Sequence, residues 1–427
     1  MTHPEEPSTG AHTQGIPAPS PEATTGVTTT PGSDPERPSG NGRWYDVARA
    51  ITTGNALVAV LSIFLAVVVG SILILVTDDA VRESAGYLGS RPSDFFRSSW
   101  EAISGAYSAL FRGSVYNSRG ADFAAQIRPL TETLKFAAPL IAAGLGVGLA
   151  FRTGLFNIGG RGQMLLAGAA AGWIGINADG PAIIQLPLAI IVGMAVGALW
   201  AGLAGLLKAR TGAHEVIVTI MLNYVAFYLV FYALSRQSLL QAPGSINPKS
   251  LPMDDSATMP KLLGERFNLH LGFVLALVAV AVVWWLLSRS ALGFRFRAVG
   301  VNPHAARTAG IDVGRTYVVA MLIAGALVGL AGVNQTLGTT TAGVTTDLDA
   351  GIGFDAITVA LLGRSHPLGI LGAGLLFGAF KAGGFSMQAS EGIPVDIVLV
   401  IQSLIVLFIA APPLVRAMFR LPAKEAA

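Results

Sequence analysis

Ten stretches of apolar residues, separated by polar and glycine-rich segments, run along the chain between residues 54 and 411. A helix that spans a bilayer needs about 20 predominantly apolar residues. Most of the stretches approach that length, but Gly162–Ile176 and Phe354–Leu362 are short, so full and partial spans both stay open for these two. The other predicted spans are Gly54–Val76, Thr131–Ala150, Ile183–Leu207, Ala213–Leu234, Leu271–Leu287, Tyr317–Leu337, Leu368–Gln388 and Pro394–Ala411. The pattern predicts an all-α polytopic membrane protein with about ten transmembrane segments, discontinuous helices and an arrangement compatible with an inverted repeat.

The basic residues predict which loops lie in the cytoplasm, because cytoplasmic loops are enriched in Lys and Arg. Arg43 and Arg49 flank the first span, and basic residues follow the fourth, sixth, eighth and tenth spans. With ten crossings all of these positions fall on one side. We therefore expect a multi-pass protein of the plasma membrane with both termini in the cytoplasm. Residues 289–315 then form a cytoplasmic loop, while residues 78–130, 241–269 and 339–353 lie outside.

Composition divides the chain into a membrane domain and two tails. Overall, 52% of the residues are hydrophobic and 12% are charged, against about 25% charged residues in an average soluble protein. Residues 1–43 are rich in Pro, Thr, Ser and Gly and contain no aromatic residue, which predicts a disordered cytoplasmic tail. The membrane domain is expected at residues 44–415, followed by a short cytoplasmic tail at residues 416–427. Within residues 78–130, apolar and aromatic residues recur at helical spacing from Asp94 to Asn117, which predicts an amphipathic helix on the membrane.

The predicted cytoplasmic loop carries the most specific motif. Asn302 and Pro303 can start a short helix, Ala305 and Ala306 give it a face of small residues, and Gly310 can end it. The spacing His304-Ala305-Ala306, three residues, then Gly310 resembles the coupling-helix signature of ATP-binding-cassette importer permeases, in which a Glu usually stands at the position of His304. The wider string GFRFRAVGVNPHAARTAGI is similar to the permeases of the simple-sugar and nucleoside, branched-chain amino acid-type family. The resemblance implies that Arg295, Arg297, Asn302, His304, Ala305, Ala306 and Gly310 couple the chain to an ATPase.

Two further strings contain polar residues at predicted membrane depth. FRTGLFNIGGRGQ, at residues 151–163, interrupts the helical pattern with four glycines and an asparagine. Irregular backbone at that depth is tolerated only where it is buried in protein or faces a water-filled cavity. The string resembles the FNIG-x-x-GQ signature of nucleoside-type permeases, although Arg161 stands where an acidic residue is common. In HEVIVTIMLNYVAFYL, residues Glu215, Thr219 and Asn223 share one helix face.

These strings, with GFDAITVALLGRSHPLGILGAGLLFGAF further on, supply candidate residues of a solute path. The alternatives are a tight turn without solute contact for the first string and hydrogen bonding between helices for the second. The candidate path residues are Phe156, Asn157, Gln163, Thr219, Asn223, Asp355 and Thr358.

The resemblance implies the permease subunit of an importer that translocates a nucleoside or simple sugar. It implies an extracytoplasmic solute-binding protein, a second homologous permease chain and a separate ATPase that binds ATP and Mg²⁺. The chain itself has no cysteine and no GxxxxGK[ST] phosphate loop, and it carries no recognisable catalytic or metal-binding constellation. We therefore expect neither an enzyme nor a protein that binds cofactors or nucleic acid. Residues 78–130 would receive the binding protein or act as a spacer.

Two other classes of function stay open from the residues alone. An ion-coupled secondary transporter could use Glu215, Asp355 or Asp396 as a proton or sodium site. The docking-type loop argues against it, because a self-contained transporter needs no helix for a partner. A membrane-embedded enzyme is the third class, and the missing catalytic constellation argues against that one.

Overall fold

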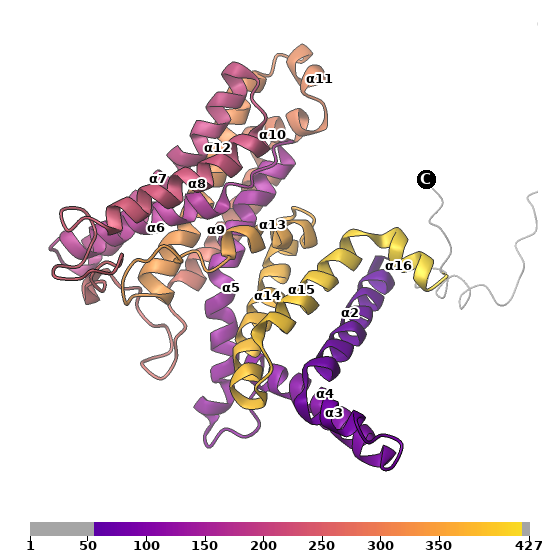
Figure 1. Cartoon of the computed structure of the whole chain (residues 1–427). Coiled ribbons are helices and arrows are strands. Elements are labelled where there is room, and N and C mark those ends of the chain that lie inside the picture. Colours follow the sequence, from indigo (N-terminus) through magenta and orange to yellow (C-terminus); the bar gives the residue numbers. More distant parts are fainter. Residues whose placement is uncertain (1–54, 421–427) are drawn as a thin grey trace, which may run out of the picture. The chain divides into compact units, whose positions relative to one another are not determined.

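The computed structural model (Figure 1) describes residues 55–420. The predicted N-terminal tail and residues 421–427 of the predicted C-terminal tail lie outside the described residues. The described part is helical and contains no β-sheet, with one isolated bridge between Lys261 and His270. The helices are α2 (Asn55–Thr77), α3 (Asp79–Ala85), α4 (Pro92–Ser114), α5 (Phe123–Arg152), α6 (Gly160–Asn177), α7 (Ala182–Thr211), α8 (Glu215–Leu234), η1 (Asp255–Ala257), α9 (Gly272–Arg289), α10 (Ala291–Val301), α11 (Pro303–Thr308), α12 (Val313–Asn334), η2 (Gln335–Thr339), α13 (Ile352–Leu362), α14 (Pro367–Glu391), α15 (Val395–Ala410) and α16 (Pro412–Met418).

The polytopic all-α fold is confirmed, but the count of about ten spans is not supported. Within residues 55–420, seven helices are long and apolar enough to cross a bilayer, and the number becomes eight if the bent pair α15–α16 forms one span. The two short predicted segments explain the difference. Helix α6 begins with a polar Gly-Arg-Gly-Gln turn, and α13 has only 11 residues, about 16 Å of helix against a hydrocarbon core of about 30 Å.

Capping residues set where several helices begin. Helix α5 starts at Phe123, eight residues before the predicted span, because the Asp122 side chain accepts a hydrogen bond of 2.8 Å from the Ala125 N–H. Helix α12 starts at Val313 because Asp312 accepts one of 2.9 Å from the Arg315 N–H. The helix predicted from Asp94 to Asn117 is present as α4.

Small residues bring the helices of the membrane domain close together. Where α7 crosses α12, a Cβ atom on Gly197 would lie 2.6 Å from the Gly325 carbonyl oxygen. Helix α4 packs on α14 in the same way, since a Cβ on Gly383 would lie 2.6 Å from the Leu110 carbonyl oxygen. Such contacts let backbones approach in lipid, where the hydrophobic effect does not drive helix association. Figure 1 shows α7 beside α12 and α5 beside α14.

Helix ends and loops group as the predicted sidedness requires. At one end, Arg152 at the end of α5 donates 3.0 Å to the Ser365 carbonyl oxygen after α13, and α10 packs against Gly154. At the other end, the loop after α8 contacts the loop after η2, where the Ser250 N–H donates 3.1 Å to the Val344 carbonyl oxygen. The predicted cytoplasmic and outer segments therefore separate, while the assignment of either end to the cytoplasm stays a prediction.

Helices α6 and α13 meet at their N-termini. A Cβ on Gly160, the first residue of α6, would lie 2.7 Å from the carbonyl oxygen of Gly353 in the first turn of α13. Each follows a long helix and an irregular segment, because α5 precedes α6 and α12 with η2 precedes α13. This order is what an inverted repeat would produce, although the repeat itself stays a prediction.

Candidate functional site

The helix predicted in the coupling loop is present as α11. The Asn302 side-chain oxygen accepts hydrogen bonds from the N–H groups of His304 (2.9 Å) and Ala305 (3.1 Å), and Pro303 takes the first helical position. Gly310 lies just beyond the helix with φ of +80°, a left-handed conformation that glycine adopts without strain. The sequence prediction of a short helix from Asn302 to Gly310 is confirmed.

Helix α11 has one buried face and one exposed face. Ala306 is buried against Val299 of α10 and Val313 of α12, whereas His304 and Ala305 are exposed. Packing on two neighbouring helices and a side-chain cap together hold the helix in place. The result is a short, anchored helix that presents small residues and a histidine outward.

A groove of about 570 Å³ lies beside α11, between α10 and the start of α12. Its polar lining includes Arg295, Asp312 and Arg315, and Phe296 is fully buried beneath it. Arg297 is half-buried and does not line this groove. Six of the seven predicted coupling residues therefore lie on α11, cap it or line its groove. The seventh, Arg297, does none of these.

The second predicted string forms an irregular segment that is clamped onto α8. The Asn223 side chain accepts 2.9 Å from the Gly162 N–H and donates 2.9 Å to the Ile158 carbonyl oxygen. The Thr219 hydroxyl oxygen lies 3.3 Å from the Ile158 N–H, which donates to it. Because Asn223 stands eight residues along α8 from Glu215, α6 begins about 12 Å above the start of α8. The interruption is therefore a re-entering segment rather than a turn at the helix end.

Asn157 and Gln163 bond to each other inside this segment. The Gln163 side chain donates 3.0 Å to Asn157 Oδ1, which also accepts 3.0 Å from the Gly159 N–H. Both side chains are buried, at 0% and 1% exposed, so they stabilise the segment rather than line an open space. Phe156 is 41% exposed and packs on Phe151 with ring centroids 4.6 Å apart.

An ion pair closes the segment at the start of α8. The Glu215 carboxylate accepts 2.6 Å from Lys208 Nζ at the end of α7, and its other oxygen lies 3.4 Å from the Phe156 N–H. Glu215 is 7% exposed. This carboxylate therefore ties α7, α8 and the irregular segment together.

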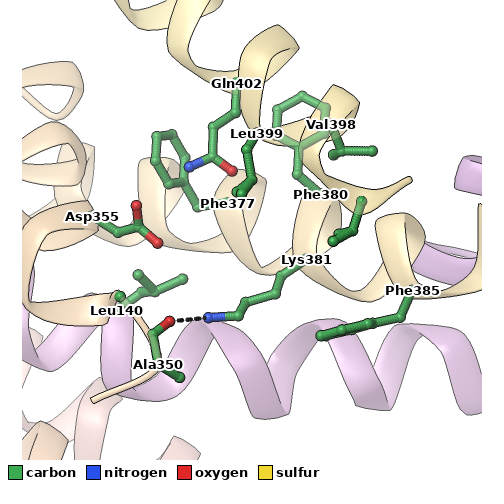
Figure 2. A pocket seen from close by; sticks show the side chains of 12 residues that line it. Leu140, Ala350, Asp355, Phe377, Phe380, Lys381, Phe385, Val398, Leu399 and Gln402 are labelled. Carbon is green, nitrogen blue, oxygen red and sulfur yellow. Dashed lines mark hydrogen bonds between the residues drawn. The ribbon is translucent and has the colours of Figure 1, made fainter. Parts of the chain in front are cut away.

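The candidate path residues Asp355 and Thr358, from the string GFDAITVALLGRSHPLGILGAGLLFGAF, lie on α13. Asp355 on α13 lines a pocket of about 210 Å³ with Lys381 of α14 and Gln402 of α15, among apolar side chains. Figure 2 shows the Asp355 carboxylate and the Gln402 amide directed into this space, while the Lys381 amine donates 3.0 Å to the Ala350 carbonyl oxygen. Thr358 is half-buried and lines none of the described pockets. Asp355 and Thr358 thus do not join the clamped segment.

A slot that the sequence reasoning missed opens beside the clamp. It has a volume of about 380 Å³, and its lining includes Arg161, Asn223, Tyr224, Phe227, Tyr228 and Phe354. Tyr224 and Tyr228 are 62% and 65% exposed. The sequence signal for this slot is the i, i+4 spacing of the two tyrosines next to Asn223. Arg161 stands out in the sequence only because it replaces the acidic residue that is common at this position of the similar motif.

Comparison with known proteins finds a family model and several relatives that match most of the membrane domain. The family model described as "Branched-chain amino acid transport system / permease component" matches residues 130–410. The chain is 39% identical over 319 residues to the guanosine ABC transporter permease protein NupP of Bacillus subtilis (strain 168). The aligned region covers 74% of this chain and 88% of NupP. It is 35% identical to the nucleoside ABC transporter permease protein NupB of Lactococcus lactis subsp. cremoris (strain MG1363), over 68% of this chain and 81% of the relative.

A third relative has a different named substrate. The glucose ABC transporter permease protein TsgB13 of Haloferax volcanii is 37% identical over 66% of this chain and 75% of its own length. No solved structure matches the chain. The relatives are named as permeases, which are transport components rather than enzymes. Since the family model covers well over half of the sequence, the chain belongs to the permease component family of branched-chain amino acid transport systems.

Proposed function

We propose that this chain is the membrane permease subunit of an ATP-binding-cassette importer and that it translocates a nucleoside or a simple sugar. The names of the relatives support these substrate classes, since they include guanosine, nucleoside and glucose permeases. The partners are a cassette ATPase that binds ATP and Mg²⁺, a second homologous permease chain and an extracytoplasmic solute-binding protein. The α11 helix carries the proposal, because it is anchored by Ala306 and its cap while its outer face is free for a partner.

The mechanism follows from how α11 is connected. It packs on α10 and on the start of α12, and α10 in turn contacts the end of α5 at Gly154. A displacement of α11 by an ATPase would therefore reach both α5 and α12, the helices that precede the two shorter helices α6 and α13. Alternating access would arise as these units move relative to one another around the solute path.

The ion-coupled alternative has less support. Glu215 is engaged by Lys208 and by the irregular segment, which makes it a structural tie. Asp396 is exposed at the start of α15. Asp355 is the remaining candidate, and it shares its pocket with the amine of Lys381.

Copurification from mild detergent tests the proposal. The tagged chain should recover a cassette ATPase, and Ala305→Glu on the exposed face of α11 should abolish that recovery while membrane insertion is retained. Ala305 is better suited than Gly310, since the φ of +80° at Gly310 would strain any replacement.

Ala182→Glu supplies the matched control, because Ala182 is exposed in the first turn of α7, away from α11. That variant should retain the ATPase. Recovery of the ATPase with Ala305→Glu would refute the coupling role of α11. Recovery of the chain alone, together with proton- or sodium-dependent uptake, would refute the importer assignment.

A further inference from the structure

The slot between α8 and the N-termini of α6 and α13 combines aromatic faces with a cation. Tyr224, Phe227 and Tyr228 come from two turns of α8, and Phe354 comes from the first turn of α13. Phe227 and Tyr228 meet edge to face, with ring centroids 5.3 Å apart. The Arg161 guanidinium lies 5.5 Å from the Phe227 ring centroid. An exposed set of aromatic rings beside a guanidinium suits a flat ligand that is polar at its edge.

Asn223 and Arg161 are the polar side chains of the slot other than the tyrosine hydroxyl groups, and they differ in how far they are engaged. Asn223 uses its oxygen and its nitrogen on the backbone of the clamped segment. Arg161 Nε lies 3.3 Å from Asp349 Oδ1, yet among the described residues this buried nitrogen has no hydrogen-bond partner. A guanidinium carries five N–H donors in a planar fork. Nε is buried on the side of Asp349, whereas the Arg161 side chain as a whole is 34% exposed, so the donors left for a ligand are those of the exposed part of the guanidinium.

The helix ends add to the preference for electronegative groups. Helix α6 has 18 residues and α13 has 11, and both point their N-termini at this place, where Gly160 and Gly353 touch. A helix N-terminus carries a partial positive charge and favours acceptors. Asp349 offsets part of the charge of Arg161. A neutral ligand that is rich in acceptors therefore fits better than an anion.

We propose that this slot binds the base of a purine nucleoside that carries a 6-oxo group, as guanosine and inosine do, during its passage through the permease. This proposal rests on the importer function given above. The aromatic side chains would stack on the base, a contact open to any base because each has a π-face. Arg161 would donate to O6 and N7 on one edge, the pair of acceptors that an arginine fork matches. A hexose has neither the flat ring nor that edge.

Competition for uptake by the wild-type complex tests the choice of substrate without any variant. In proteoliposomes that hold the complete transporter and its binding protein, unlabelled guanosine and inosine should inhibit labelled guanosine uptake at least about tenfold more strongly than adenosine. Ribose and glucose should not compete. Uptake of glucose without any nucleoside uptake would overturn this proposal and leave the importer assignment intact, whereas failure to recover an ATPase would overturn the importer assignment itself.

Substitutions in the slot test its residues. Tyr224→Leu and Tyr228→Leu should each raise the KM for guanosine about tenfold, while ATPase recovery and the thermal midpoint stay unchanged. Tyr232→Leu is the control, because Tyr232 is a tyrosine further along α8 that is 54% exposed and does not line the slot. Unchanged KM values in both slot variants would overturn the proposal.

Arg161→Lys tests the edge contact separately, because it keeps a positive charge near Asp349 and removes the planar fork. It should weaken competition by guanosine and inosine more than competition by adenosine or uridine. An equal loss for all four nucleosides would refute recognition of the 6-oxo edge.

Discussion

Asn223 shows how a polar side chain inside a spanning helix can serve the backbone of another segment. Its amide satisfies the Gly162 N–H and the Ile158 carbonyl group at once, and the residue is 7% exposed. Buried backbone groups without partners are costly in a medium without water. The residue-level role of Asn223 is therefore to make the irregular segment possible.

Asn223→Ala should lower the stability of the protein by roughly 1–3 kcal/mol, because it leaves two backbone groups without partners. The midpoint of thermal unfolding in detergent measures this. Asn177→Ala is the matched control, since Asn177 is exposed and its side chain donates 2.9 Å to the Trp173 carbonyl oxygen within α6. Equal midpoints for the two variants would contradict the clamp.

His270 gives a second prediction at the residue scale. It lies just before α9, where its Nδ1 accepts 3.2 Å from the Gly272 N–H. Burial, and then the charge of Lys135, lower its pKa from 6.5 to about 4. In the unfolded chain the ring takes up a proton below pH 6.5, whereas in the folded protein it does so only near pH 4. The folded state therefore loses stability as the pH falls from about 6.5 to 4, in total by about 3 kcal/mol.

Thermal midpoints measured from pH 7.5 to pH 4.5 test this. The wild type should lose stability on acidification more steeply than His270→Gln, which cannot titrate at this position. His304→Gln on the exposed face of α11 controls for the loss of a histidine. Parallel curves for the wild type and His270→Gln would rule out the contribution of His270.

At the scale of elements, the meeting of α6 and α13 depends on glycine. A Cβ atom on Gly353 would overlap the backbone nitrogen of Arg161, and one on Gly160 would lie 2.7 Å from the Gly353 carbonyl oxygen. Backbone cannot yield as a flexible side chain can. Two helices shorter than a bilayer are thereby joined end to end, which buries their termini and positions Arg161 beside the slot.

Gly353→Ala should destabilise the protein by about 1–3 kcal/mol through overpacking and reduce solute uptake. Gly372→Ala is the control, because Gly372 lies in α14, where a Cβ would have no atom within 4 Å other than those of its chain neighbours and the adjacent backbone of its own helix. The control should be neutral or slightly stabilising, since alanine is a better helix former than glycine. Equal midpoints and uptake for both variants would mean that the contact of α6 with α13 is dispensable.

For the whole molecule, the predicted sidedness bears most directly on the proposed function. Helix α11 is the proposed contact for a cytoplasmic ATPase, and the loop that holds Asn247 contacts the segment after η2 at the opposite end. The chain has no cysteine, so single cysteines can report the exposure of each end without background.

Thr308→Cys and Asn247→Cys, both at exposed positions, should react with a membrane-impermeant thiol reagent from opposite sides. In right-side-out vesicles Asn247→Cys should be labelled and Thr308→Cys should not, and inside-out vesicles should reverse the result. The unmodified chain should show no labelling. Labelling of Thr308→Cys from the outside would show that the orientation is opposite to the proposed one.

Local sequence determined much of this architecture. Long apolar runs predict the positions of the helices, because a segment in contact with lipid must form all its backbone hydrogen bonds within itself. The short helix α11 followed from a cap, a proline and a glycine within nine residues, Asn302 to Gly310. These features depend on neighbours in the chain, so a single sequence carries them.

The tertiary structure alone decided which partners the polar residues have. Thr219 and Asn223 stay predicted residues of a solute path, and their hydrogen-bond partners lie about 60 residues away in the clamped segment. Asn223 also lines the slot. Asn157 and Gln163 are likewise engaged with each other. Helical periodicity assigns a residue to a face, yet it does not say which segment that face meets. For the same physical reason no local pattern predicts the slot with Arg161 and Phe354. It depends on the contact of α6 with α13, which are separated in the chain by six α-helices, α7 to α12.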